Sequence, residues 1–157
     1  MCNESQCVLS SFLKANQIQA EIHTLLGQTR TVEEAVEELN IDAHRIIKTI
    51  VMISGNGQPL IAYVLGDRKV SYPKLRKIIG ADSIRLASTD EVREITGYQV
   101  GAVPPVGHKK LVRCFMDQEI LELEFVTGGG GAIDRLLTIK TKDIVRVINP
   151  EICEISK

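Results

Sequence analysis

The chain lacks a hydrophobic run long enough to cross a membrane. No apolar stretch approaches the roughly 20 residues that a membrane-spanning helix requires. The segment from Met1 to Gln17 also lacks the charged start and continuous apolar stretch of a signal peptide. We therefore expect a cytoplasmic protein that makes no membrane contact.

Cysteine is scarce, and its spacing carries no metal-binding pattern. The four cysteines form no CxxC pair and no cluster with histidine: Cys2, Cys7, Cys114 and Cys153. Cys114 lies in a strand-like run, where a small buried apolar role is more common than that of a nucleophile. The sequence predicts no metal site, no cofactor and a reduced environment.

The common catalytic and nucleotide-binding motifs are missing as well. GxSxG, HExxH and an obvious nucleophile–base pair do not occur. The four glycines at 128–131 are not followed by the lysine of a P-loop, and the GxGxxG spacing of a dinucleotide site is absent. An enzyme with this sequence would have to rely on positioned backbone dipoles and on groups of its substrate.

The composition suits one compact domain. The chain has 157 residues, of which 44% are hydrophobic and 25% charged, and these shares are ordinary for a globular protein. No internal repeat or linker interrupts it. We expect a single domain over residues 1–157, with a peripheral helix within residues 1–18. The sequence leaves open whether the protein is a monomer or a homodimer.

Local patterns predict the helices and strands. Capping boxes start helices at Thr31 and Ser88, and Asn56-Gly57 is a strong hairpin signal between two apolar runs. Helices are expected at 5–16, 31–39, 71–79, 88–96 and from 141, and strands at 20–26, 46–53, 60–65, 83–87, 110–115, 120–125 and 133–139. Because strands and helices are interspersed without strict alternation, we expect an α/β protein of the α+β type, with helices packed around a mixed sheet.

Charge is distributed unevenly along the chain. The net charge is −1, but residues 44–113 carry twelve Lys and Arg against five Asp and Glu, and the segments on both sides are acidic. If this charge gathers on one face, it suits a polyanionic partner, whereas scattered over helix surfaces it indicates only solvation.

Two features stand out as candidate site elements. Lys48 interrupts an apolar strand, so its amine either reaches solvent at an edge or serves as a fixed cation in a cleft. The segment 97–108 combines glycines with Pro104 and Pro105, and such a turn can aim backbone N–H groups at one point. His108 ends this segment, which makes it the best site candidate among the three histidines. The glycines at 128–131 could cradle a phosphate or form a hairpin tip.

Together these segments resemble the YbaK/prolyl-tRNA-synthetase-associated editing domain family. The resemblance runs from Gln19 to Ile148 and rests on the order of these segments: 31–35, 47–49, 66–70, 85–88, 97–107 and the glycine run before Ile133. It implies a mixed, barrel-like β-sheet ringed by helices. It also implies a free-standing aminoacyl-tRNA deacylase that hydrolyses the ester at the 3′ end of a mischarged tRNA, of the Ala- or Cys-tRNA(Pro) type. The implied partner is tRNA, with an aminoacyl-tRNA synthetase as a second candidate.

The same resemblance assigns roles to individual residues. It places Lys48, Gly101 and Pro105 in the catalytic site. Lys48 would hold a phosphate or the terminal adenosine, and the Gly101–Pro105 backbone would position the aminoacyl carbonyl. Water would be activated by the substrate ribose hydroxyl, or the thiol of a cysteine substrate would itself attack. The implied substrate-binding residues are Thr49, Tyr98, Ala102, Val103, Gly107, His108, Gly129 and Gly130. Ala102, Pro104 and Val106 depart from the commonest family pattern, which leaves the amino-acid specificity open.

Two other functions are compatible with the sequence. The protein could be a non-catalytic tRNA- or nucleotide-binding module of the same fold, which would bind tRNA without turnover. It could also hydrolyse small activated esters, in which case uncharged tRNA would not compete.

Overall fold

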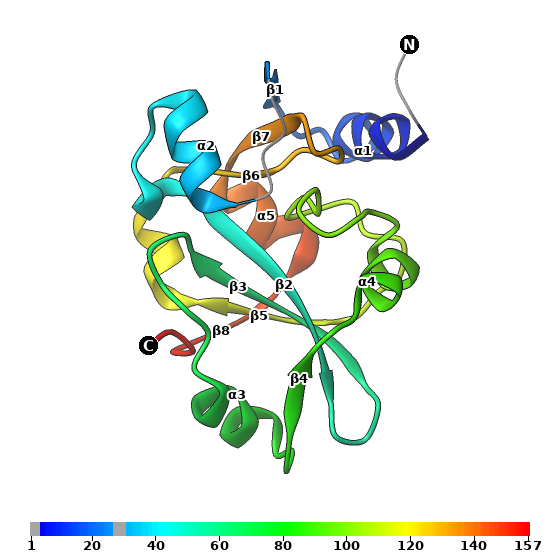
Figure 1. The fold of residues 1–157 in the computed structure, drawn as a ribbon, viewed down its shortest axis with the longest axis vertical. Coiled ribbons are helices and arrows are strands. Elements are labelled where there is room, and N and C mark those ends of the chain that lie inside the picture. Colours follow the sequence, from blue (N-terminus) through cyan, green and yellow to red (C-terminus); the bar gives the residue numbers. More distant parts are fainter. Residues whose placement is uncertain (1–3, 27–30) are drawn as a thin grey trace.

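A computed structural model describes residues 4–26 and 31–157 of the chain (Figure 1). The helices are α1 (Glu4–Ala15), α2 (Val32–Leu39), α3 (Tyr72–Ile79), α4 (Thr89–Thr96) and α5 (Thr141–Ile148), with short 3-10 helices η1 (Ala43–Arg45) and η2 (Gln118–Glu122). The strands are β1 (Ala20–Thr24), β2 (Ile47–Ser54), β3 (Pro59–Leu65), β4 (Ile84–Leu86), β5 (Arg113–Asp117), β6 (Phe125–Gly129), β7 (Arg135–Lys140) and β8 (Glu151–Cys153).

The helix ends lie where the capping signals predict them. At each of three N-termini a hydroxyl accepts a hydrogen bond from the backbone N–H three residues later: Thr31, Ser71 and Ser88. A full capping box is present at Ser88, where the Glu91 carboxylate also accepts the Ser88 N–H. Gly80 and Gly97 end α3 and α4 in the left-handed conformation that glycine favours.

Two sheets form the centre of the fold. The five-stranded sheet has the order β4-β2-β3-β5-β8, in which β3–β5 and β5–β8 are parallel and the other pairs antiparallel. The three-stranded sheet, β1-β7-β6, is antiparallel. An isolated parallel bridge between Ile46 and Thr127 joins them. The mixed sheet and the family-like fold are confirmed, but within the described residues the two sheets do not close into a barrel.

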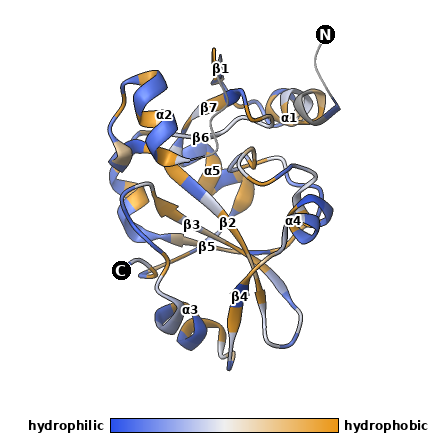
Figure 2. Cartoon of the chain, in the orientation of Figure 1, coloured by the Kyte–Doolittle hydropathy of each residue, from blue (hydrophilic) through white to orange (hydrophobic). Residues whose placement is uncertain are grey.

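Buried side chains lie on both faces of the larger sheet. Because side chains alternate along a strand, Tyr63 of β3 packs in one core while Ala62 packs in another. The first core joins the two sheets, and the second lies against α3. Leu9 and Leu13 of α1 belong to the first core, so the N-terminal helix packs on the rest of the fold. Figure 2 shows the hydrophobic colour of β2 interrupted by a short polar stretch.

The prediction of a strand at 120–125 is wrong. Most of this segment is η2, which begins because the Asp117 carboxylate caps the Glu119 N–H and ends where Leu123 N–H bonds to the Ile120 carbonyl. The strand β6 begins only at Phe125 and continues into the glycine run, so that Gly128 and Gly129 are strand residues. Strand β8 and helix η1 lie where the sequence pattern predicted no element.

None of the helices formed by the described residues has both the length and the apolar character that crossing a membrane requires.

Candidate functional site

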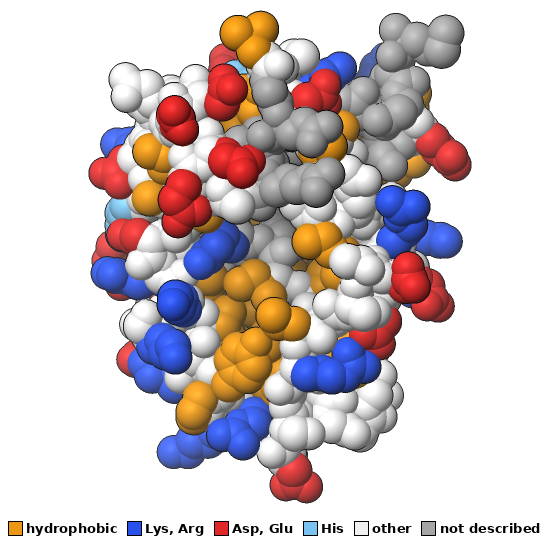
Figure 3. Space-filling model, in the orientation of Figure 1, with side chains coloured by type: hydrophobic (Ala, Val, Ile, Leu, Met, Phe, Trp, Pro, Cys, Tyr) orange, Lys and Arg blue, Asp and Glu red, His pale blue; other side chains and the backbone are white. Residues whose placement is uncertain are grey.

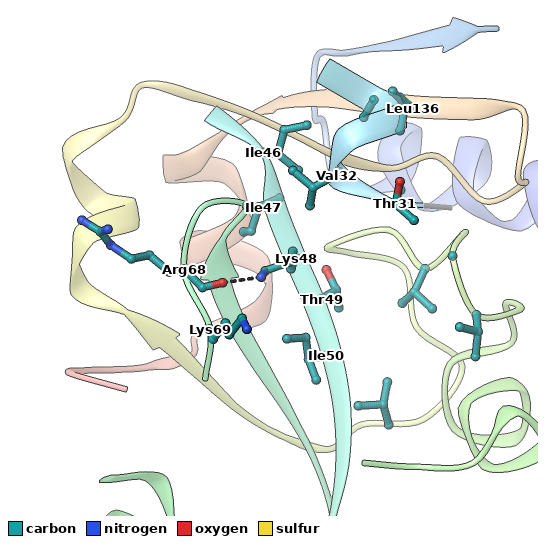
Figure 4. A pocket seen from close by; sticks show the side chains of 18 of the residues that line it. Thr31, Val32, Ile46, Ile47, Lys48, Thr49, Ile50, Arg68, Lys69 and Leu136 are labelled. Atoms are coloured by element: carbon teal, nitrogen blue, oxygen red, sulfur yellow. Dashed lines mark hydrogen bonds between the residues drawn. The ribbon is translucent and has the colours of Figure 1, made fainter. Parts of the chain in front are cut away.

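A cavity of about 600 Å³ opens at the edge of the five-stranded sheet, beside the first half of β2. It exists because β4 is short and pairs only with Met52, Ile53 and Ser54. Beyond that point α2, the loop after β3, the turn after α4 and strand β6 surround the edge of β2 (Figure 4). The charged side chains of its lining are Glu33, Lys48, Asp67, Arg68 and Lys69. Most of the remaining lining is aliphatic.

The ammonium of Lys48 is a half-buried cation in this cavity. Its ammonium donates a hydrogen bond to the backbone carbonyl of Arg68, which lies on the loop after β3 (Figure 4). Burial lowers the pKa of Lys48, and the charge of Lys69 lowers it further, whereas the carboxylates of Glu33 and Asp67 raise it. The amine is therefore held in place by a neutral acceptor, and it forms no direct ion pair with a carboxylate among the described residues.

Thr49 presents an unpaired polar group. Its hydroxyl is buried and makes no hydrogen bond with any described residue, although Thr49 lines the cavity. Buried hydroxyls are nearly always bonded, so an unpaired one in a cavity wall suits a polar atom of a ligand.

The backbone of Thr49 also faces the open edge of β2. Val51 accepts a hydrogen bond of 3.0 Å from Ala87 N–H, so the backbone of Val51 points toward the β4 side. Since N–H and C=O directions repeat every second residue, the N–H and C=O of Thr49 point to the same side, where β4 has ended. The cavity therefore offers a strand edge as well as side chains.

Two buried tyrosines donate hydrogen bonds to the segment 101–107, which contains the Gly101–Pro105 turn. The Tyr63 hydroxyl donates to the Pro105 carbonyl at 2.8 Å, and the Tyr98 hydroxyl donates to the Gly107 carbonyl at 2.8 Å. Burial raises the pKa of Tyr98 to about 12 and that of Tyr63 well above its ordinary value, so both remain donors at neutral pH. Gly101 begins the turn with a φ of 89°, a conformation that glycine adopts readily.

His108 ties the end of the turn back to its middle. Its Nε2 donates to the Pro104 carbonyl at 2.6 Å. Burial lowers the pKa of His108, and this effect outweighs the hydrogen bond to Pro104, which raises it. A neutral imidazole with its proton on Nε2 therefore serves as a structural donor in this position.

The glycines of β6 allow the turn to lie close against the strand. A Cβ atom at Gly129 would lie 2.4 Å from the Val103 carbonyl oxygen and 2.8 Å from its carbon. A Cβ atom at Gly128 would lie 3.0 Å from the Ile47 side chain. Gly131 N–H bonds to the Ala102 carbonyl at 2.9 Å. The glycine run thus makes room for backbone to approach backbone at the cavity wall.

The structure divides the residues assigned from sequence into two groups. Five of them line the cavity together: Lys48, Thr49, Gly101, Val103 and Gly129. The other six lie outside the cavity lining, in or against the turn: Tyr98, Ala102, Pro105, Gly107, His108 and Gly130. For both groups, a part in binding or catalysis stays a prediction. Cys114 is no nucleophile candidate, because burial raises the pKa of its thiol to about 11.

The comparison with protein families decides the identity of the fold. The family model described as aminoacyl-tRNA editing domain matches residues 27–147. The chain belongs to this family. The resemblance to the YbaK/prolyl-tRNA-synthetase-associated domain is thereby confirmed.

The curated relatives of this editing domain include proline–tRNA ligases. It is 38% identical over 128 residues to a proline–tRNA ligase of Oleidesulfovibrio alaskensis, which covers 81% of this chain and 22% of the ligase. A proline–tRNA ligase of Caldicellulosiruptor saccharolyticus is 32% identical over 126 residues, covering 80% of this chain and 22% of the ligase. The chain thus spans about a fifth of the length of these curated relatives.

Solved structures share the fold over the whole chain. The crystal structure of hypothetical protein APE2540 has a TM-score of 0.88 and 28% identity, covering 96% of this chain and 99% of that one. A protein proposed as a trans-editing enzyme for prolyl tRNA synthetase also has a TM-score of 0.88, at 24% identity, covering 100% and 99% of the two chains. The second likeness concerns the fold alone.

The residue pattern alone assigns no role to the loop after β3. Asp67, Arg68 and Lys69 of the editing domain line the cavity, and the Arg68 carbonyl binds Lys48. A backbone carbonyl leaves no mark in the residue pattern. The signal that could have located it is the polar segment 66–70 directly after the apolar strand β3, one of the segments that carries the family resemblance.

Proposed function

We propose that this editing domain is a hydrolase that deacylates mischarged aminoacyl-tRNA in trans, at the ester of the tRNA 3′ end. One observation carries the proposal: the half-buried Lys48 ammonium and the unpaired Thr49 hydroxyl share an otherwise mostly aliphatic cavity with the Gly101–Val103 turn. A cation suits the phosphate or terminal adenosine end of the substrate, and an aliphatic wall suits a small amino-acid side chain.

We propose roles for the individual groups from the family resemblance, and the positions of Lys48 and Gly101 in the cavity lining support them. Lys48 binds the tRNA end, and the rigid backbone of the Gly101–Pro105 turn positions the aminoacyl carbonyl. The described side chains of the cavity lining include no Cys, His or Ser. Attack by a water molecule that the substrate ribose hydroxyl activates is consistent with that lining.

The surface around the cavity supports a polyanionic partner on one side. Figure 3 shows Lys and Arg side chains along the loop after β3 and over α3, beside an apolar strip, whereas acidic side chains gather over α2. α3 carries Lys74, Arg76 and Lys77 and no acidic residue, and α2 carries four glutamates and no basic residue. We infer that the tRNA approaches from the α3 side.

The relatives support the substrate and the mode of action. Proline–tRNA ligases are among the sequence relatives, and a protein proposed as a trans-editing enzyme for prolyl tRNA synthetase shares the fold over nearly its full length. We therefore propose that residues 1–157 act as one editing domain on tRNA(Pro) charged with a small residue such as alanine or cysteine. A synthetase pocket discriminates by only about 1–3 kcal/mol per methylene group, so such errors need correction.

The test is a deacylation panel with Ala-tRNA(Pro), Cys-tRNA(Pro) and other mischarged tRNAs. We expect Lys48→Met to lower kcat/KM by about 10- to 100-fold, the effect of losing one charge-assisted contact. Lys110→Ala, which removes an exposed cation paired with Glu94 at 3.2 Å, is the matched control and should retain activity. Salt-sensitive tRNA binding without turnover would contradict the proposed hydrolase and indicate a non-catalytic binding module.

A further inference from the structure

The position of Lys48 depends on the loop after β3, which carries its hydrogen-bond acceptor. The Arg68 carbonyl, the acceptor of the Lys48 ammonium, lies between the exposed residues Asp67 and Lys69. Such a surface turn is ordinarily mobile, and a mobile acceptor would not hold an ammonium in one place. The contacts that hold this loop from outside the cavity therefore determine where the acceptor of Lys48 lies.

A bidentate ion pair holds the Arg68 side chain. Arg68 Nε donates to Glu119 Oε2 at 3.0 Å, and Arg68 Nη2 donates to Glu119 Oε1 at 3.3 Å. Paired bonds of this kind fix the orientation of the guanidinium as well as its distance. Glu119 belongs to η2 and does not line the cavity.

A buried carboxylate in turn fixes η2 and the C-terminal segment. Asp117 is 1% exposed. One of its oxygens accepts the Glu119 N–H at 2.9 Å, and the other accepts the N–H groups of Ile155 and Ser156 at 2.9 and 2.8 Å. Burial raises the pKa of Asp117, but the N–H bonds outweigh this effect and keep the pKa below its usual value. The carboxylate therefore stays ionised.

The C-terminal segment is bonded to the far end of the same loop. Ser71 N–H donates to the Ile155 carbonyl at 2.6 Å, and Lys157 N–H donates to the Lys69 carbonyl at 2.9 Å. The loop is thus held through Glu119 at Arg68 and through the C-terminal segment at Lys69 and Ser71. Both attachments lead to Asp117.

We propose that Glu119 is a positioning residue for Lys48: by holding the Arg68 guanidinium from outside the cavity, it fixes the Arg68 carbonyl that orients the Lys48 ammonium. The proposal deepens the proposed function, since Lys48 is the residue assigned there to the tRNA end. Glu119 touches neither the cavity nor a substrate within it, so it acts only through the loop.

The charge state of Lys48 provides a readout of this role. The charged groups that act on its ammonium are Glu33 of α2 and Asp67 and Lys69 of the loop, and Asp67 is itself paired with His44 at 3.0 Å. A carbonyl that accepts from the ammonium favours the charged form. When the carbonyl moves away, the pKa of Lys48 falls further below its usual value.

Two single variants separate positioning from direct electrostatics. Glu119→Gln removes a negative charge and Arg68→Gln removes a positive charge, so direct Coulomb effects on Lys48 have opposite signs. Positioning predicts that both variants lower the Lys48 pKa. Because they remove the same contact, the double variant should lower it no further than either single one.

The experiment is an NMR titration of the Lys48 Cε signal in the 13C-lysine-labelled full chain, assigned with Lys48→Met. The matched control is Arg113→Gln, which breaks a similar bidentate pair with Glu151 (2.6 and 3.1 Å) away from the cavity. The control should leave the Lys48 titration unchanged. Exposed ion pairs contribute little to stability, so all variants are expected to fold.

Deacylation kinetics give the second readout. Glu119→Gln should lower kcat/KM by about tenfold or more and move the alkaline limb of its pH profile to lower pH. An unchanged Lys48 pKa in both single variants, or shifts in opposite directions, would overturn the proposal. The titration does not need turnover, so a wild-type chain that cleaves no mischarged tRNA would refute the proposed function and leave this test intact.

Discussion

The Tyr63 hydroxyl lies 2.8 Å from the Pro105 carbonyl oxygen and joins strand β3 to the last residue of the Gly101–Pro105 turn. Tyr63 is fully buried, and in the register of the sheet it lies opposite Thr49 of β2. The strand that carries Lys48 and Thr49 and the turn that faces them are therefore held at a set distance by one neighbouring side chain.

Removal of this hydroxyl should loosen the turn. We expect Tyr63→Phe to lower the free energy of unfolding by about 1–3 kcal/mol, because the buried Pro105 carbonyl loses its donor. The variant should also lower kcat, since the turn is no longer held at a fixed distance from β2. Urea unfolding and single-turnover deacylation measure the two effects. Tyr72→Phe is the control, because the Tyr72 hydroxyl bonds to no described residue. If Tyr72→Phe lowered stability and kcat as much as Tyr63→Phe, the effect of Tyr63→Phe could not be assigned to the Pro105 contact.

The glycine run supports a second prediction. Gly129→Ala places a methyl group 2.4 Å from the Val103 carbonyl oxygen, and backbone cannot move aside as a side chain can. We expect a loss of about 1–3 kcal/mol in the free energy of unfolding and a loss of activity as the turn is displaced. Gly57→Ala tests backbone strain alone, because Gly57 has a φ of 83° and open space around it at the β2–β3 hairpin. It should lose some stability and keep its activity.

Local signals in the sequence predicted much of the fold and only part of the candidate site. Thr31, Ser88, Gly80 and Gly97 mark helix ends through contacts within a few residues, so a linear pattern contains them. The cavity wall is different. Gly129 is needed because Val103 backbone approaches it from another segment, and no local pattern encodes that approach.

The same distinction explains the remaining differences. The apolar residues at 120–125 fit a strand as well as a short helix. The cap that Asp117 provides favours the helical conformation and starts η2. The Arg68 carbonyl can accept from Lys48 only because the fold brings β2 and the loop after β3 side by side, and a linear pattern does not contain this contact. Lys48 stood out because a lysine within an apolar strand is rare, and this made the residue detectable while its acceptor was not.

The burial of His108 predicts a pH-dependent stability. The folded-state pKa of His108 lies below the ordinary histidine pKa of 6.5, so below that pH the unfolded chain binds the proton more readily. The stabilising contribution is thus complete above pH 6.5 and is lost as pH falls toward the folded-state pKa. We expect the stability difference between wild type and His108→Gln to be larger at pH 8 than at pH 5. Denaturant titrations at both values measure it, and a difference independent of pH would contradict a neutral imidazole.

Thr49 predicts opposite effects on stability and on activity. Its buried hydroxyl has no partner among the described residues, and Thr49→Val replaces it with a methyl group of similar size. Removal of an unsatisfied polar group from the interior is neutral or stabilising, so the variant should be at least as stable as wild type. If the hydroxyl binds the substrate, kcat/KM should fall by about tenfold, as expected for the loss of one hydrogen bond.

Thr141 provides the matched control for this prediction. Its hydroxyl is also buried and unpaired among the described residues, but Thr141 does not line the cavity. Thr141→Val should therefore be neutral or stabilising in urea unfolding and unchanged in deacylation. Equal activity of the two valine variants would show that the Thr49 hydroxyl is idle. Loss of activity in Thr49→Val alone, without loss of stability, would instead mark it as a substrate contact, because a residue retained only for the fold cannot combine these two results.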